Sequence, residues 1–184
     1  HESCLYYETR LMLAAGIIGM DDLLDDLSEH IGEIESHEGH RHMSLRQSSY
    51  DIWLNFFNRA ANGKDVRISY YEKGPILGLL FDIELRRMTD GKRSLDDLMR
   101  LLYRRYYLEL KRGFTEQEFW AAVEEVAGQP VDTLRKYVDT TAEIDYDSII
   151  NHAGLRLDRN SWKLVRMEHP DKSQLRLRRQ MWGE

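Results

Sequence analysis

Apolar residues recur every three or four positions along most of the chain, the spacing that places them on one face of an α-helix. The pattern is strongest between Met20 and Ser36, where it predicts an amphipathic helix with buried Leu23, Leu24, Leu27, Ile31 and Ile34. A shorter apolar run predicts a helix from Leu5 to Ala15, followed by Gly16 as a natural C-terminal stop.

Capping boxes mark the starts of three further helices. In this motif an N-cap hydroxyl and an acidic side chain three residues later satisfy backbone N–H groups of the first helical turn. The pairs are Ser69 with Glu72, Ser94 with Asp97, and Thr115 with Glu118. They predict helices over 69–88, 94–112 and 115–127.

The remaining segments predict shorter elements and a change of period near the end. We expect a loop over 37–43 and short helices over 49–58, 130–139 and 146–153. After Gly154 the pattern favours two strands, 162–166 and 175–178, with a turn over 169–172. The predicted fold class is all-α: a helical bundle over 1–154 and a β-like tail over 155–184 that is either a small hairpin or the start of another module.

Size and composition are those of a soluble protein. With 184 residues and 42% hydrophobic residues, the chain can bury one sizeable core. No apolar run approaches the roughly 20 residues that a membrane-spanning helix needs, so we expect no membrane partner. The chain begins with His1 and Glu2 instead of an initiator methionine or a signal peptide. We therefore expect the native N-terminus upstream, and the cellular compartment is left open.

The net charge of −6 is unevenly distributed. The segment 155–184 has eight Lys or Arg against four Asp or Glu, whereas the rest of the chain is acidic. Because these basic residues alternate with Leu and Val as on a solvated strand, we expect no nucleic-acid partner. The predicted helix over 20–36 has an acidic face that fits solvent, a cation or a basic partner, and a solvated face is the commonest case.

Two groups of residues invite a reactive or metal-binding interpretation. Cys4 is the only cysteine, which excludes an internal disulfide, and its apolar neighbours favour a core position over a nucleophile. His37, His40 and His42 are zinc-ligand types close together in the sequence. Their spacing does not place two ligands on one helical face, and the chain contains no HExxH. A structural or exposed loop is favoured, with metal binding as the alternative.

The run Tyr70-Tyr71-Glu72-Lys73-Gly74 opens one of the predicted helices. A tyrosine in a first turn, near unbonded N–H groups and the positive end of the helix dipole, can direct its hydroxyl at a developing oxyanion. Tyr71 shares a helical stripe with small and polar residues, which would leave space beside it: Gly74, Pro75, Gly78 and Asp82. The alternative is that both tyrosines pack in the core.

The run from Ser69 to Arg87 is similar to the glycyl-aminopeptidase family of zinc metallopeptidases. Segments 44–53, 93–99, 113–116, 146–147 and 153–157 resemble that family in the same order, so the likeness covers roughly positions 1–157. The resemblance implies a multi-domain parent with a β-rich N-terminal domain, a thermolysin-like catalytic domain and a PDZ module. It also implies that this chain resembles the helical C-terminal subdomain of thermolysin-like aminopeptidases.

By the same resemblance, Tyr71 is the tyrosine that hydrogen-bonds the tetrahedral oxyanion. The family's HExxH helix, which supplies two zinc ligands, would lie upstream of His1. Its third ligand, a Glu five residues before a Tyr-Tyr pair, falls on His1, with Glu2 one place later. Zinc therefore belongs to the parent enzyme, and we expect no stable zinc binding in this chain. Pro75, where the family tends to have Ala, is a second departure.

These features predict a fragment of a zinc aminopeptidase that forms one wall of the active-site cleft and is inactive alone. Its partners would be a peptide substrate in the parent and the missing N-terminal half of the catalytic domain. Without that half, exposed apolar surface would promote self-association. The alternative is a non-catalytic, peptidase-like helical domain that binds a peptide or a protein.

Overall fold

The computed structural model describes residues 4–51 and 66–183, with no description of the Cys4 side chain. The first helices confirm the predicted pattern, and the predicted loop over 37–43 contains one short helix. The predicted helix over 49–58, with Trp53, Phe56 and Phe57, lies largely outside the described residues. The elements up to the central helix are α1 (Cys4–Ala14), α2 (Met20–Glu35), α3 (Gly39–His42), α4 (Leu45–Tyr50) and α7 (Tyr70–Met88).

The second half of the chain is also mainly helical. The predicted helix over 94–112 begins as an α-helix but continues as a π-helix before it ends. The elements are α8 (Leu95–Leu102), the π-helix η1 (Tyr103–Glu109), α9 (Glu116–Ala127), α10 (Asp132–Asp139), α11 (Tyr146–Ile150), the 3-10 helix η2 (Asn151–Ala153), β1 (Leu155–Asp158), β2 (Lys163–Arg166) and α12 (Lys172–Trp182). The described residues form the predicted all-α fold, together with one small hairpin near the C-terminus.

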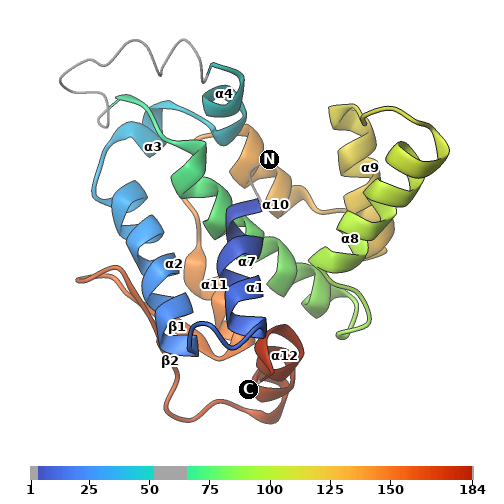
Figure 1. Ribbon diagram of the computed structural model, residues 1–184. Coiled ribbons are helices and arrows are strands. Elements are labelled where there is room, and N and C mark those ends of the chain that lie inside the picture. The colour runs from blue at the N-terminus through green and yellow to red at the C-terminus, as the bar shows by residue number, and fades with distance from the viewer. Residues whose placement is uncertain (1–3, 52–65, 184) are drawn as a thin grey trace.

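Helix α7 is the centre of the fold. Fourteen of its nineteen residues, from Lys73 to Arg86, are buried, because other helices surround it. Figure 1 shows α1 and α2 beside it, and α8 and α9 forming an arm that projects to the right. Leu95 and Leu98 of α8 and Trp120 of α9 belong to the same hydrophobic core as α7. No helix in the described part of the chain has both the length and the apolar character needed to cross a membrane.

The tail differs from its predicted form in its second half. The hairpin pairs β1 with β2 in antiparallel register, so the predicted strand over 162–166 is confirmed in position, but its partner precedes it. The predicted strand over 175–178 is wrong, since these residues belong to α12. Asp171 caps this helix by accepting from the N–H groups of Ser173 and Gln174, and the Gln174 side chain accepts from Asp171 N–H. This capping box outweighs the alternating Leu-Arg pattern.

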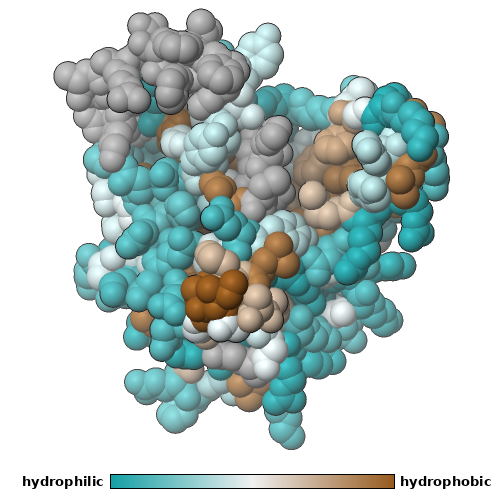
Figure 2. Space-filling model, in the orientation of Figure 1, coloured by the Kyte–Doolittle hydropathy of each residue, from teal (hydrophilic) through white to brown (hydrophobic). Residues whose placement is uncertain are grey.

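The surface is mostly hydrophilic, with local apolar patches. Figure 2 shows these patches over the region of α1 and over the arm formed by α8 and α9. Near the C-terminal end of α1, Leu11 and Ile17 are exposed. The large apolar residues exposed on the arm are Met99, Tyr103, Tyr107, Leu108, Leu110 and Phe114.

The contact between α1 and α7 depends on one glycine. A Cβ atom at Gly78 would lie 2.6 Å from Tyr6 Cβ and 2.9 Å from Tyr6 Cγ, too close for these atoms to coexist. We expect Gly78→Ala to lower the free energy of unfolding by about 1–2 kcal/mol, because α1 must shift away from α7. The measurement is chemical denaturation followed by circular dichroism.

A matched control is Gly32→Ala in α2. A Cβ there would lie 3.7 Å from Trp162 Cβ, an ordinary contact, so the better helix propensity of alanine should raise stability by up to about 1 kcal/mol. Two variants of equal stability would contradict the close contact between α1 and α7.

Candidate functional site

The entrance of α7 is held by Ser69. This residue has extended backbone angles, its Oγ accepts from Tyr71 N–H at 3.1 Å, and its carbonyl accepts from the N–H groups of Glu72 and Lys73. The predicted N-cap is thus confirmed. The predicted reciprocal bond from Glu72 is wrong, because that carboxylate lies 2.6 Å from His30 Nδ1 on α2 instead. A tertiary partner has replaced the local one.

Tyr71 lies at this entrance with 52% of its surface exposed. Its ring stacks on the ring of Tyr70, with centroids 4.3 Å apart and planes inclined by 30°. Tyr70 is half-buried and packs against the core, but Tyr71 does not, so the alternative of two core tyrosines is wrong for Tyr71. The phenol hydroxyl can therefore meet a group that approaches from outside.

The stripe of small residues along α7 does not provide the open space that its composition suggested. Gly74, Pro75, Gly78 and Asp82 are all buried. The side chain of Tyr6 from α1 lies against Gly78 and donates a hydrogen bond to Asp82 at 3.3 Å. The stripe is thus a helix-packing surface.

A pocket of about 470 Å³ adjoins the entrance of α7 on the side of α2. It contains the pair of His30 and Glu72, and its described lining brings together carboxylates, imidazoles and one guanidinium. The described lining residues are Glu29, His30, Glu33, Ile34, His37, His40, Arg67, Ile68, Ser69 and Glu72. This side of the Tyr71 turn is therefore polar and hollow.

Lys73, two residues after Tyr71, is only 2% exposed. Burial lowers the pKa of its ammonium group to about 8, and the negative charge of Glu35 opposes this shift. Glu35 in turn accepts a hydrogen bond from the buried Tyr146 hydroxyl at 2.7 Å. Lys73 is thus a buried cation at neutral pH, which faces the core and α2 instead of the exterior.

Among the described residues, the histidine loop is not placed to assemble a metal site. His40 is buried, and its Nδ1 lies 2.8 Å from the carbonyl oxygen of His37 and 3.0 Å from that of Ile34. His37 lies 3.8 Å from Glu33, and His42 is exposed. Within residues 4–51 and 66–183, no three His, Cys, Asp or Glu side chains are placed to hold a metal ion. His1 and Glu2, the positions of the third zinc ligand, lie outside the described residues.

The acidic face of α2 meets basic residues of the tail. Asp21 pairs with Arg166, and Asp25 lies 3.7 Å from Lys163, both on β2. The same strand is joined to α2 by a hydrogen bond from Leu164 N–H to Ser28 Oγ. The side chains of Asp21 and Asp25 remain 80% and 69% exposed, so the favoured reading of a solvated face is confirmed, with two exposed ion pairs to the chain's own hairpin.

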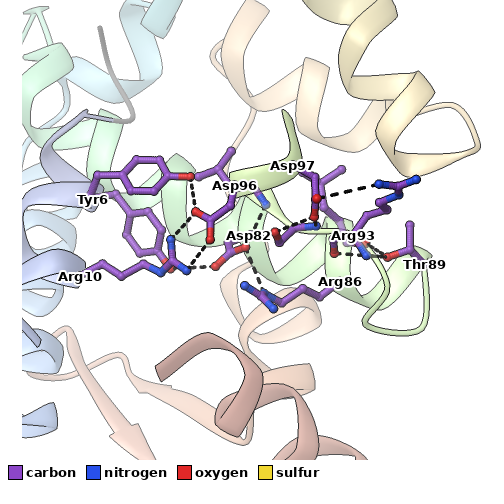
Figure 3. A network of polar contacts seen from close by, with 12 residues as sticks. Tyr6, Arg10, Asp82, Arg86, Thr89, Arg93, Asp96 and Asp97 are labelled. Atoms are coloured by element: carbon purple, nitrogen blue, oxygen red, sulfur yellow. Dashed lines mark hydrogen bonds and ion pairs between the residues drawn. The ribbon is translucent and has the colours of Figure 1, made fainter. Parts of the chain in front are cut away.

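A buried polar network fixes α1 against α7 and α8 (Figure 3). Asp82 is fully buried and accepts from the Tyr6 hydroxyl, from Arg86 Nε at 3.1 Å and from Leu95 N–H at 3.0 Å. Sequence reasoning gave Asp82 no role beyond the stripe. The only signal in the sequence was its charge, since Asp82 lies within a mainly apolar run.

The network continues to Asp96 at the start of α8. Its carboxylate accepts from Arg10 at 2.6 and 2.9 Å and from the Tyr7 hydroxyl at 2.7 Å. The hydrogen bonds from Arg10 lower the pKa of Asp96 to about 2, against the opposing effect of burial. Asp96 thus joins α1 to α8, and Asp82 joins both of these helices to α7, which carries Tyr71.

Comparisons with known proteins agree with the predicted resemblance. Residues 3–77 match the sequence model of the M61 glycyl aminopeptidase family. The fold resembles the crystal structure of an aminopeptidase N family protein from Idiomarina loihiensis, with a TM-score of 0.78 and 22% identity. That match covers 85% of this chain and 27% of the other, so this chain spans about a quarter of its length. None of the curated proteins matches the chain.

The matched segment includes the helix entrance with Ser69, Tyr71 and Glu72. The likeness to a glycyl-aminopeptidase-like family is thus confirmed over residues 3–77, and the helical fold resembles part of an aminopeptidase N family structure. At 22% identity the solved structure supports the fold alone.

Proposed function

Starting from this likeness to glycyl-aminopeptidase-like proteins, we propose that the chain forms one wall of a peptidase active-site cleft and presents Tyr71 to the substrate. The parent reaction would be hydrolysis of an N-terminal peptide bond. The observation that carries the proposal is the half-exposed phenol of Tyr71 at a capped helix entrance, inside the segment that matches the family.

The geometry of the entrance suits an oxyanion. When water adds to the scissile carbonyl carbon, the carbonyl oxygen becomes negatively charged, and a donor already in place stabilises that charge. The Tyr71 hydroxyl supplies such a donor, and the first turn of α7 contributes the positive end of its dipole. Ser69 limits the motion of the turn by holding Tyr71 N–H.

Zinc, when bound, would activate the attacking water. The described residues provide no set of ligands for it, so the proposal assigns the zinc site to other parts of the protein. What this chain contributes is the hydroxyl of Tyr71 and the helices that place it.

The direction of α1 supports the proposal that this chain forms one wall of the active-site cleft. Tyr6 contacts Gly78 and Asp82, and Arg10, one turn later, reaches Asp96, whose neighbour Leu95 bonds to Asp82. Figure 1 shows that the two helices run in broadly the same direction. The start of α1 thus lies towards the Tyr71 end of α7. This is the direction in which the family resemblance places the third zinc ligand.

The test is a peptidase assay on two proteins: the 184-residue chain and a longer protein that carries it with the preceding zinc-binding segment. We expect the longer protein to release glycine from glycyl-p-nitroanilide, to lose this activity with a zinc chelator and to regain it with added zinc. The chain alone should be inactive. A zinc-loaded longer protein without activity on any N-terminal residue would contradict the proposal.

The second candidate is a non-catalytic, peptidase-like domain that binds a peptide or protein, supported by the polar pocket beside α7. It predicts peptide binding by calorimetry without cleavage, and a parent sequence with no HExxH helix before this segment.

Under the first proposal, the chain alone lacks the half that covers its apolar patches. Self-association of the chain is then expected.

A further inference from the structure

A side-chain pair joins α2 to the turn that carries Tyr71. His30 Nδ1 lies 2.6 Å from Glu72 Oε2, and Glu72 directly follows Tyr71. Both side chains are partly buried, with 22% and 32% exposure. A hydrogen bond of this length between an imidazole and a carboxylate is strongest when the imidazole is protonated.

This turn has features that make an external link important. Pro75 has no N–H group, so the carbonyl of Tyr71 lacks its usual hydrogen bond within the helix. The Glu72 carboxylate does not close the capping box, because it bonds to His30. The pocket beside the turn leaves room for the turn to move towards or away from α2.

We propose that His30 and Glu72 are positioning residues for Tyr71. While the pair is formed, it holds the first turn of α7 against α2 and fixes the direction of the phenol. When His30 loses its proton, the link weakens and the turn shifts into the space beside it. The catalytic part of this inference rests on the proposed function, whereas the link between the two side chains does not.

The groups around His30 determine the direction of the pH effect. Glu72 faces it from α7. On its own helix Asp26 lies 4.0 Å from Nε2, and Glu29 is adjacent. Arg67, Glu33 and His37 line the same pocket. The hydrogen bond to Glu72 is the largest cause that raises the pKa of His30, burial opposes it, and Asp26 and Glu29 raise it further.

A raised pKa in the folded state means that the pair stabilises the turn at low pH. Its contribution is complete below about pH 6.5, the ordinary pKa of histidine, and is lost as the pH rises through the raised value. We therefore expect Tyr71 to be held best below about pH 6.5 and to be released as the pH rises through the raised pKa of His30.

The first test is nuclear magnetic resonance on the 184-residue chain with labelled histidine and tyrosine. The ring signals of Tyr71, assigned by their loss in Tyr71→Phe, should shift with the titration of His30. In Glu72→Gln, the pKa of His30 should move down towards its ordinary value, and the Tyr71 signals should no longer follow it. The control is His152→Gln. His152 belongs to η2 and lies near the C-terminal end of α7, so this variant should change neither the titration of His30 nor the response of the Tyr71 signals.

The second test uses the catalytically competent longer protein. Glu72→Gln and His30→Gln should each lower kcat roughly ten- to hundred-fold with little change in KM, the scale expected when a reacting group is misplaced by up to about 1 Å. The decrease of kcat that accompanies the loss of the His30 proton should disappear in His30→Gln. A purely structural role would not move the pH profile.

The outcomes separate the two proposals. If the Tyr71 signals follow His30 but the longer protein has no peptidase activity, the positioning pair stands and the proposed function fails. If the Tyr71 signals of the unaltered chain do not follow His30, the positioning proposal is overturned, whatever the activity. If Glu72→Gln does not fold, His30→Gln gives the same comparison, since glutamine is neutral at every pH.

Discussion

Replacing Asp82 with alanine should lower the free energy of unfolding by about 3–5 kcal/mol, the cost of removing one partner from a buried ion pair. The carboxylate is fully buried and accepts from Tyr6, Arg86 and Leu95. Without it, the Arg86 guanidinium, itself 7% exposed, is left buried without this counter-charge. The backbone N–H of Leu95 loses its acceptor at the start of α8. Urea denaturation of the purified chain measures the change.

Asp82→Asn is the matched control. The asparagine side chain has the same shape and keeps one oxygen for the Leu95 N–H group, but it lacks the negative charge that balances Arg86. We expect a loss between that of the alanine variant and zero. If the free energy of unfolding of Asp82→Ala lies within about 1 kcal/mol of that of the unaltered protein, the network contributes no more than an exposed ion pair would.

Replacing Tyr71 with phenylalanine should lower kcat of the zinc-loaded longer protein about 10²- to 10³-fold, the effect of deleting one oxyanion donor. KM should change little, because the lost hydrogen bond forms to the charge that develops in the transition state. Stability should be unaffected, since the ring is 52% exposed and the substitution removes only its hydroxyl. Steady-state kinetics with glycyl-p-nitroanilide measures both constants.

Tyr70→Phe provides the comparison within the same turn. Tyr70 packs against the core and stacks on Tyr71, so its phenylalanine variant keeps the aromatic contact and should retain nearly full activity. Full activity in Tyr71→Phe would contradict the proposal that the Tyr71 hydroxyl donates to the oxyanion. A large loss in Tyr70→Phe, with Tyr71→Phe unchanged, would transfer the role to the neighbouring residue.

Local patterns predicted most of the helices because their signals lie within a few residues of each other. The Ser69 cap, the acidic helix over 20–36 and the helix over 115–127 follow from spacing and capping alone. The strand predicted over 175–178 is wrong because the helix cap at Asp171 outweighs the alternation of apolar and basic residues on which that prediction rests. A capping box was readable there, since Gln174 follows Asp171 by three residues.

Contacts between distant segments could not be read in this way. Glu72 had a plausible local role beside Ser69, but it bonds to His30, 42 residues earlier in the chain. The acidic face of α2 is largely exposed, as predicted, but its ion pair between Asp21 and Arg166 joins residues that are 145 positions apart in the chain. In each case the local pattern gave the correct chemistry of the side chain, and only tertiary packing selected its partner.

The exposure of Tyr71 illustrates the same limit at the candidate site. Spacing placed Tyr71 and Gly78 on one stripe and suggested open space along it. The structure divides that stripe, since Tyr6 covers Gly78 while Tyr71 remains exposed. Another helix covers part of a helical face where it crosses it. Here α1 crosses α7 at Gly78, and this tertiary contact cannot be read from the spacing within α7.

The contact of the hairpin with α2 has a practical consequence for dividing this chain into smaller pieces. Ending a shortened protein at Gly154 would remove Leu155, Leu157 and Leu164 from the hydrophobic core and leave Ser28 without the Leu164 N–H group. It would also remove the cations of β2 that pair with the exposed carboxylates of Asp21 and Asp25. Any expressed version meant to fold as a cooperative unit should therefore extend past the hairpin and through α12.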